Sequence, residues 1–158
     1  MSSFRLLAVA ASMGCLGLLS SGCPSDHGDH PDAMTFTCAD DGRAPEWVAN
    51  YAASGTAIKV TVNSNPAPPA KGDSTWTILV TDQNDTPLDG LTVDSTPFMP
   101  DHGHGTPLQE TVTAGSQAGE YVLSPVNLWM PGYWEVTIAV DDGDGLTDSV
   151  MYEVCIDG

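Results

Sequence analysis

The sequence predicts an all-β fold, an immunoglobulin-like β-sandwich of about seven strands. The first observation is alternation, because several short stretches place apolar side chains at every second position, which is the period of a half-buried strand. The second observation is that clusters of Pro, Gly, Asn and Asp, which are typical of turns, separate these stretches. The third is that no helical period of useful length occurs. Short strands at turn-separated spacing are typical of a sandwich.

The strands can be placed in order along the chain. The expected strands are 56–63, 74–82, one around Leu91 and Val93, a weaker one around Leu108 and Val112, 121–126, 133–141 and 149–157. In the first of them Ile58, Val60 and Val62 share the inward face. Ahead of the strands, the segment 45–51 is expected to form a short helix with Pro45 in its first turn, or an irregular arm.

The N-terminus has the features of an export signal. Residues 1–22 carry one positive charge and then a short apolar stretch, too short for a comfortable membrane span. The stretch ends at Gly22-Cys23, a junction that resembles a bacterial lipobox and predicts lipidation of Cys23. An ordinary signal peptide cut near the same place is the alternative. Residues 23–37 are polar and are expected to be a flexible tether, followed by one domain over 38–158.

The cysteine count fits this division. Of the four cysteines, Cys15 leaves with the signal and Cys23 takes the lipid. Cys38 and Cys155 remain, and we expect them to form a disulfide in an oxidising compartment.

The charge balance limits the classes of partner. Acidic residues outnumber basic ones by 21 to 4, and the net charge is −17. Such a surface repels nucleic acids and anionic lipid headgroups. No nucleophile elbow, reactive Cys-His pair or phosphate-binding loop occurs in the sequence, so we do not expect an enzyme.

The candidate site is the stretch Met99-Pro100-Asp101-His102-Gly103-His104-Gly105, in a chain with only four histidines. In an extended segment, His102 and His104 would point to one face, with Met99 able to fold over the same point. A second Met-Pro pair begins at Met130, which could join them if both loops lie at one end of the sandwich. Thioether and imidazole together suit copper, especially Cu(I). Asp101 could supply a carboxylate, which leaves zinc open.

Each of these residues also has a simpler interpretation. Methionine beside proline at a strand end is often core filler, and histidines in a Gly-rich turn are often only solvent-exposed. His27 and His30 form a second pair in the tether, where transient metal capture is the alternative to a plain polar linker. The acidic loop 141–148 hints at calcium, but it lacks the EF-hand pattern and also reads as a hairpin turn.

Several ordered motifs give the chain a family resemblance over residues 76–140. They are Thr86-Pro87-Leu88-Asp89-Gly90-Leu91, the Met99 to Gly105 stretch, Gly119-Glu120-Tyr121 and the run from Leu128 to Val136. In these motifs the chain resembles the YtkA-like domain, which is related to the periplasmic part of FixH-type proteins. The resemblance implies a small extracytoplasmic β-sandwich, often lipid- or membrane-anchored. It also implies a link to assembly of copper-containing oxidases, although this chain lacks the transmembrane helix of FixH.

Together, these observations predict a lipid-anchored extracytoplasmic module that binds or handles copper through Met99, His102, His104 and Met130. Its expected partners are the membrane, through the lipid on Cys23, and a protein that receives the copper. Gram-negative lipoproteins that stay in the inner membrane usually carry Asp at the second mature position, where this chain has Pro24, so the resemblance to such lipoproteins favours the outer membrane of the cell envelope. The alternatives are a structural or protein-interaction sandwich that holds no metal, and a sandwich stabilised by calcium.

Overall fold

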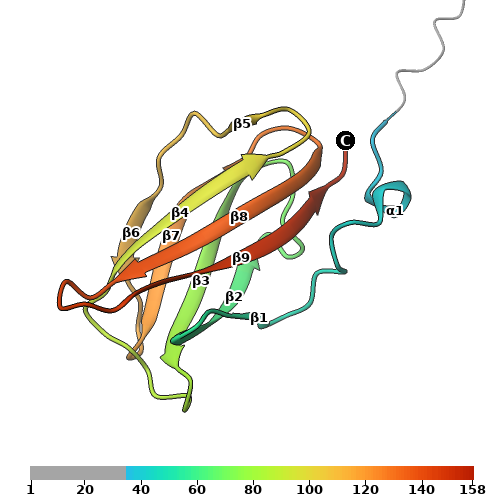
Figure 1. Cartoon of the computed structure of the whole chain (residues 1–158). Helices are drawn as coiled ribbons and strands as arrows, with labels where there is room; N and C mark the ends of the chain where they lie inside the picture. The colour runs from blue at the N-terminus through green and yellow to red at the C-terminus, as the bar shows by residue number, and fades with distance from the viewer. Residues whose placement is uncertain (1–34) are drawn as a thin grey trace, which may run out of the picture. The chain divides into compact units, whose positions relative to one another are not determined.

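The computed structural model describes residues 35–158 as two antiparallel β-sheets that pack face to face (Figure 1). The predicted signal 1–22, the lipidation site Cys23, and the tether pair His27 and His30 lie outside the described residues. The elements are α1 (Cys38–Asp41), β1 (Tyr51–Ser54), β2 (Ile58–Asn65), β3 (Gly72–Asp82), β4 (Thr92–Met99), β5 (His104–Gly105), β6 (Thr111–Ala114), β7 (Glu120–Leu128), β8 (Gly132–Asp141) and β9 (Thr147–Ile156).

The two sheets divide the strands unequally. One sheet has the order β1-β2-β3-β7-β6, and the other has the order β5-β4-β8-β9. Every pairing between neighbouring strands is antiparallel. The all-β sandwich that the alternation predicts is therefore confirmed.

The core consists of the inward-facing residues of both sheets. The predicted inward face of the first long strand, Ile58, Val60 and Val62, is completely buried. Trp76 on β3 and Trp134 on β8 are the largest of the completely buried side chains. They come from different sheets and belong to the same core cluster. The alternation of apolar residues predicts the buried side chains because one face of each strand packs against the other sheet.

The described residues contain nine strands instead of about seven. The two additional strands are short: β1 has four residues and β5 has two. The helix alternative for residues 45–51 is wrong, because this stretch is an irregular arm that leads into β1. The expected strand around Leu108 begins only at Thr111, and Leu108 is an exposed loop residue.

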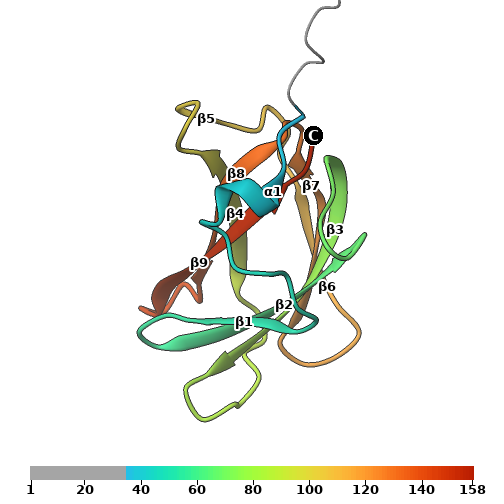
Figure 2. The same ribbon diagram turned by 90° about the vertical axis from the view of Figure 1, so that its right-hand side faces the viewer.

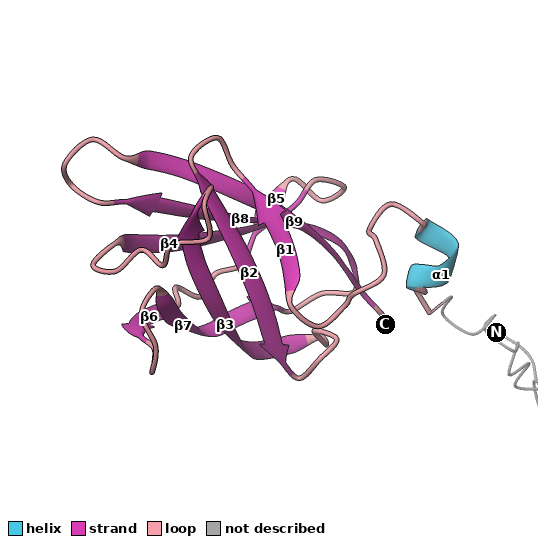
Figure 3. Ribbon diagram, turned by 90° about the horizontal axis from the view of Figure 1, so that it is seen from below, coloured by secondary structure: helices cyan, strands magenta, loops and turns pink. Residues whose placement is uncertain are grey.

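A disulfide ties the N-terminal segment to the last strand. Cys38 in α1 and Cys155 in β9 are joined, as predicted, across a sequence separation of 117 residues. The backbone N–H of Cys38 also donates to Asp157, 2.8 Å away. Figure 2 shows the segment from α1 to β1 along one side of the sandwich, and Figure 3 shows α1 beside the C-terminus.

Two polar side chains fix loops to the sandwich. The hydroxyl of Tyr121 donates to the carbonyl of Leu88 and accepts the N–H of Leu91, at 2.9 and 3.0 Å, which holds the connection from β3 to β4. The carboxylate of Asp148 accepts the N–H groups of Ala57 and Ile58, at 2.7 and 3.1 Å, which fixes the β1–β2 turn against β9. Of the helices in residues 35–158, none has the length and apolarity needed to cross a bilayer.

Candidate metal centre

The structure places the two Met-Pro segments at the same end of the sandwich. The turn after β4 and the connection from β7 to β8 meet there, because the imidazole of His104 stacks on the indole of Trp129. Their ring centroids are 5.5 Å apart and their planes differ by 25°. Cε of Met99 also lies against Gly132, at the start of β8. The tertiary fold thus brings together residues that are far apart in the sequence.

A tight turn, and not an extended segment, presents the histidines. The carbonyl of Met99 accepts the N–H groups of His102 and Gly103, at 3.2 and 2.9 Å. Gly103 has a φ of 67°, in the left-handed region where a side chain is strained. His102 therefore lies in the turn, whereas His104 is the first residue of β5. The alternation argument for this pair does not hold, yet the turn still brings the two rings close.

The two imidazoles lie 5.6 Å apart between ring centroids and are nearly perpendicular, at 88°. His102 is exposed and His104 is half-buried. Nδ1 of His104 lies 3.0 Å from the carbonyl oxygen of Gly105. A carbonyl can only accept, so the neutral ring carries its proton on Nδ1 and its lone pair on Nε2. Metal-bound histidines are commonly held in this way, with one nitrogen donating to a carbonyl and the other free for the ion.

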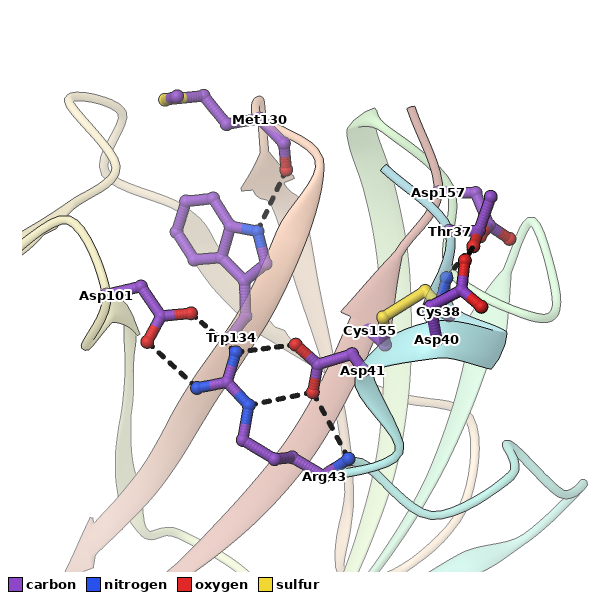
Figure 4. The surroundings of a disulfide bond; sticks show 10 residues. All are labelled: Thr37, Cys38, Asp40, Asp41, Arg43, Asp101, Met130, Trp134, Cys155 and Asp157. Atoms are coloured by element: carbon purple, nitrogen blue, oxygen red, sulfur yellow. Dashed lines mark hydrogen bonds and ion pairs between the residues drawn. A yellow bond between two sulfur atoms is a disulfide. The ribbon is translucent and has the colours of Figure 1, made fainter. Parts of the chain in front are cut away.

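The two methionines have different environments. Met99 is completely buried, because it occupies an inward position of β4. It pairs in register with His104, so both side chains lie on the same face of the sheet. Met130 is half-buried, and its carbonyl accepts the indole N–H of Trp134 at 3.0 Å. Figure 4 shows its side chain directed away from that indole. Met130 is thus only partly buried against the core, whereas Met99 would have to leave the core to bind an ion.

Asp101 is held in an ion pair at the outer side of the turn. Arg43 donates to both of its carboxylate oxygens and to both oxygens of Asp41 (Figure 4). The guanidinium also lies 4.4 Å from the ring centroid of Tyr133. Hydrogen bonds from Arg43 lower the pKa of Asp101 below its ordinary value. Asp101, the carboxylate that would be a ligand for zinc, is therefore already paired with Arg43.

Carboxylates and histidines alone do not form a further metal site in the described part of the chain. Within residues 35–158, no three side chains of His, Cys, Asp or Glu gather in an arrangement that could hold an ion. In the acidic loop 141–148, Asp141 accepts the N–H of Gly143, and Asp142 accepts those of Asp144 and Leu146. These oxygens form the turn, which is the simpler of the two interpretations of that loop.

Two residues at this end were missed by the sequence reasoning. Trp129 stands next to Met130 in the sequence, but no local pattern connects it with His104, on which it stacks. Arg43 lies far away in the sequence, so no local pattern connects it with Asp101. The available signal was its rarity, since the chain has only four basic residues to set against 21 acids.

Among solved structures, the chain is similar to a DUF4426 family protein from Pseudomonas aeruginosa PAO1. The identity is 12%, the TM-score is 0.47, and the likeness covers 67% of this chain and 96% of that one. A copper-bound variant of FetP from uropathogenic Escherichia coli strain F11 is also 12% identical, with a TM-score of 0.45 and coverage of 70% and 92%. Likenesses this distant carry no function to the present chain.

Family membership rests on the sequence. A search of the curated proteins finds no match. The YtkA-like family matches residues 52–139, a range that is wider at its N-terminal end than the resemblance seen in the motifs alone. It spans more than half of the chain and contains both loops of the candidate centre. The chain belongs to the YtkA-like family.

Proposed function

We propose that this protein is an extracytoplasmic copper-binding module, with His102, His104 and Met130 as the donors at the surface. Met99, the fourth donor that the sequence suggests, pairs in register with His104 but is completely buried, so we propose the other three as the ligands. The proposed role is to hold copper and pass it to another protein by ligand exchange. We propose a binding module and not an enzyme.

The observation that carries the proposal is the arrangement of the two imidazoles. The rings are 5.6 Å apart, and the carbonyl of Gly105 leaves Nε2 of His104 free to donate its lone pair. Imidazole binds both Cu(I) and Cu(II), and a thioether from Met130 adds the softness that Cu(I) prefers. The site is also accessible, because His102 is exposed.

The location that we propose is the cell envelope, where a lipid on Cys23 would anchor the protein to a membrane. The Cys38–Cys155 disulfide supports export, because disulfides persist in oxidising compartments. The net charge of −17 favours attraction of metal cations over nucleic acids.

Titration of the purified protein with Cu(I) and with Cu(II) tests the proposal. We compare the wild type with a double variant, His102→Ala with His104→Ala. The matched control replaces the other two histidines of the chain, His27→Ala with His30→Ala. We expect the first variant to lose affinity and the second to keep it. Equal affinities of the wild type and the first variant would end the proposal.

A module that binds another protein without metal is the second candidate. It is favoured by Phe98 and Leu108, which are 40% and 46% exposed and line one shallow groove beside β4. Unfolding temperature separates the two candidates, since a ligand that binds only the folded state raises it. A rise of several degrees with copper supports the first candidate, and no rise supports the second.

A further inference from the structure

Trp129 differs in its exposure from the two tryptophans of the core. Trp76 and Trp134 are completely buried, whereas Trp129 is 42% exposed at the end where the two loops meet. Its position directly after β7 holds it there, because Leu128 before it is fixed in the core. Packing of the core therefore does not account for this indole.

The ring that stacks on the indole of Trp129 is the imidazole of His104. The plane of His104 is tilted by only 25° from the plane of Trp129, and the centroids are 5.5 Å apart, as in an offset stack. An ion bound to a ring nitrogen lies in the plane of the imidazole. An ion on Nε2 of His104 therefore lies in a plane close to parallel with the indole face.

Resting on the proposed function, we infer that Trp129 forms one wall of the copper site and makes the site selective for Cu(I). The negative face of an indole attracts a cation within about 6 Å of its centroid. The same ring closes one side of the ion to water and to additional ligands. Cu(II) prefers a square or tetragonal set of nitrogen and oxygen donors, whereas Cu(I) is satisfied by fewer and softer ones. A wall that adds attraction but no donor favours Cu(I).

The neighbouring groups fit this arrangement. His102 stands nearly perpendicular to His104, so its ring is not parallel to the indole as the ring of His104 nearly is. Met130 directly follows Trp129 in the chain, so the wall and the soft donor belong to one connection. The carboxylate closest in sequence, Asp101, is paired with Arg43 and does not compete as a hard ligand.

The test is a comparison of Trp129→Leu and Trp129→Phe with the wild type, using competition titrations with Cu(I) and, separately, with Cu(II). We expect Trp129→Leu to weaken Cu(I) binding about tenfold, from the strength of a desolvated cation–π contact, and to change Cu(II) binding much less. Trp129→Phe keeps a ring face and should retain part of the selectivity. Phe98→Leu is the matched control, because Phe98 is 40% exposed and belongs to neither loop of the site. It should leave both affinities unchanged.

A second measurement uses the unmodified protein. Ag(I), a redox-inert substitute for Cu(I), should quench the emission of the exposed indole, and the quenched component should be missing in Trp129→Phe. Equal Cu(I) affinity of Trp129→Leu and the wild type, or no quenching by bound Ag(I), would overturn the inference and leave the proposed function intact. If the wild type binds copper in neither oxidation state, the proposed function fails first and the inference falls with it.

Discussion

Substitutions of Met99 test whether this residue packs in the core or binds copper. Its side chain is completely buried, and its terminal methyl lies against Gly132, where even a methyl side chain would meet it. Replacing such a methionine by alanine removes buried apolar surface and leaves a cavity, which costs about 2–5 kcal/mol. For a domain of this size, about 3–5 °C is lost per kcal/mol, so Met99→Ala should lower the unfolding temperature by roughly 6–25 °C.

Two leucine variants then separate packing from ligation. Met99→Leu conserves volume and should cost less than about 1.5 kcal/mol, with Cu(I) affinity close to the wild type. Met130→Leu should leave the unfolding temperature nearly unchanged and weaken Cu(I) binding. Thermal unfolding followed by circular dichroism and competition titration measure the two effects. The reasoning is refuted if Met99→Ala is as stable as the wild type, or if Met99→Leu loses Cu(I) affinity while Met130→Leu keeps it.

Three further predictions concern stability. The N–H of Ala57 lowers the pKa of Asp148, so this carboxylate stabilises the fold above about pH 4 and stops doing so as the pH falls through its folded pKa. Asp148→Asn should therefore be less stable at neutral pH in urea unfolding, and its deficit should shrink in acid; a deficit that grows in acid contradicts this. Tyr121→Phe leaves two backbone groups unpaired and should cost about 1–3 kcal/mol in the same assay, whereas an unchanged midpoint would show that water replaces the hydroxyl. The Cys38→Ser/Cys155→Ser variant releases a loop of 117 residues and should lose up to about 4–5 kcal/mol, and equal stability of oxidised and reduced protein would contradict that value.

Most of the fold follows from local alternation. The residues at every second position of 56–63, 74–82, 133–141 and 149–157 are the ones that lie in the core, because a strand can bury only one of its faces against the other sheet. Short elements are less predictable. β1 and β5 have four and two residues, too few for a period to be visible, and they exist because a neighbouring strand supplies hydrogen bonds.

The candidate site divides in the same way. The sequence identifies His102 and His104 as a pair, and the two Met-Pro segments as companions, from residue type and spacing. It also identifies Cys38 and Cys155 as partners once the other two cysteines are assigned to the N-terminus. Residue type and spacing are enough for these predictions, because each depends on which residues occur and not on which segments the fold brings together.

Only the tertiary structure distinguishes the two methionines and adds Trp129 and Arg43. Met99 ends a strand whose alternation points it inward, whereas Met130 lies in a connection and stays near the surface. Trp129 meets His104, and Arg43 meets Asp101, across 25 and 58 positions of the chain. Contacts of this kind depend on the order in which strands pair and on which loops share an end of the sandwich, and neither is encoded in the period of a single strand.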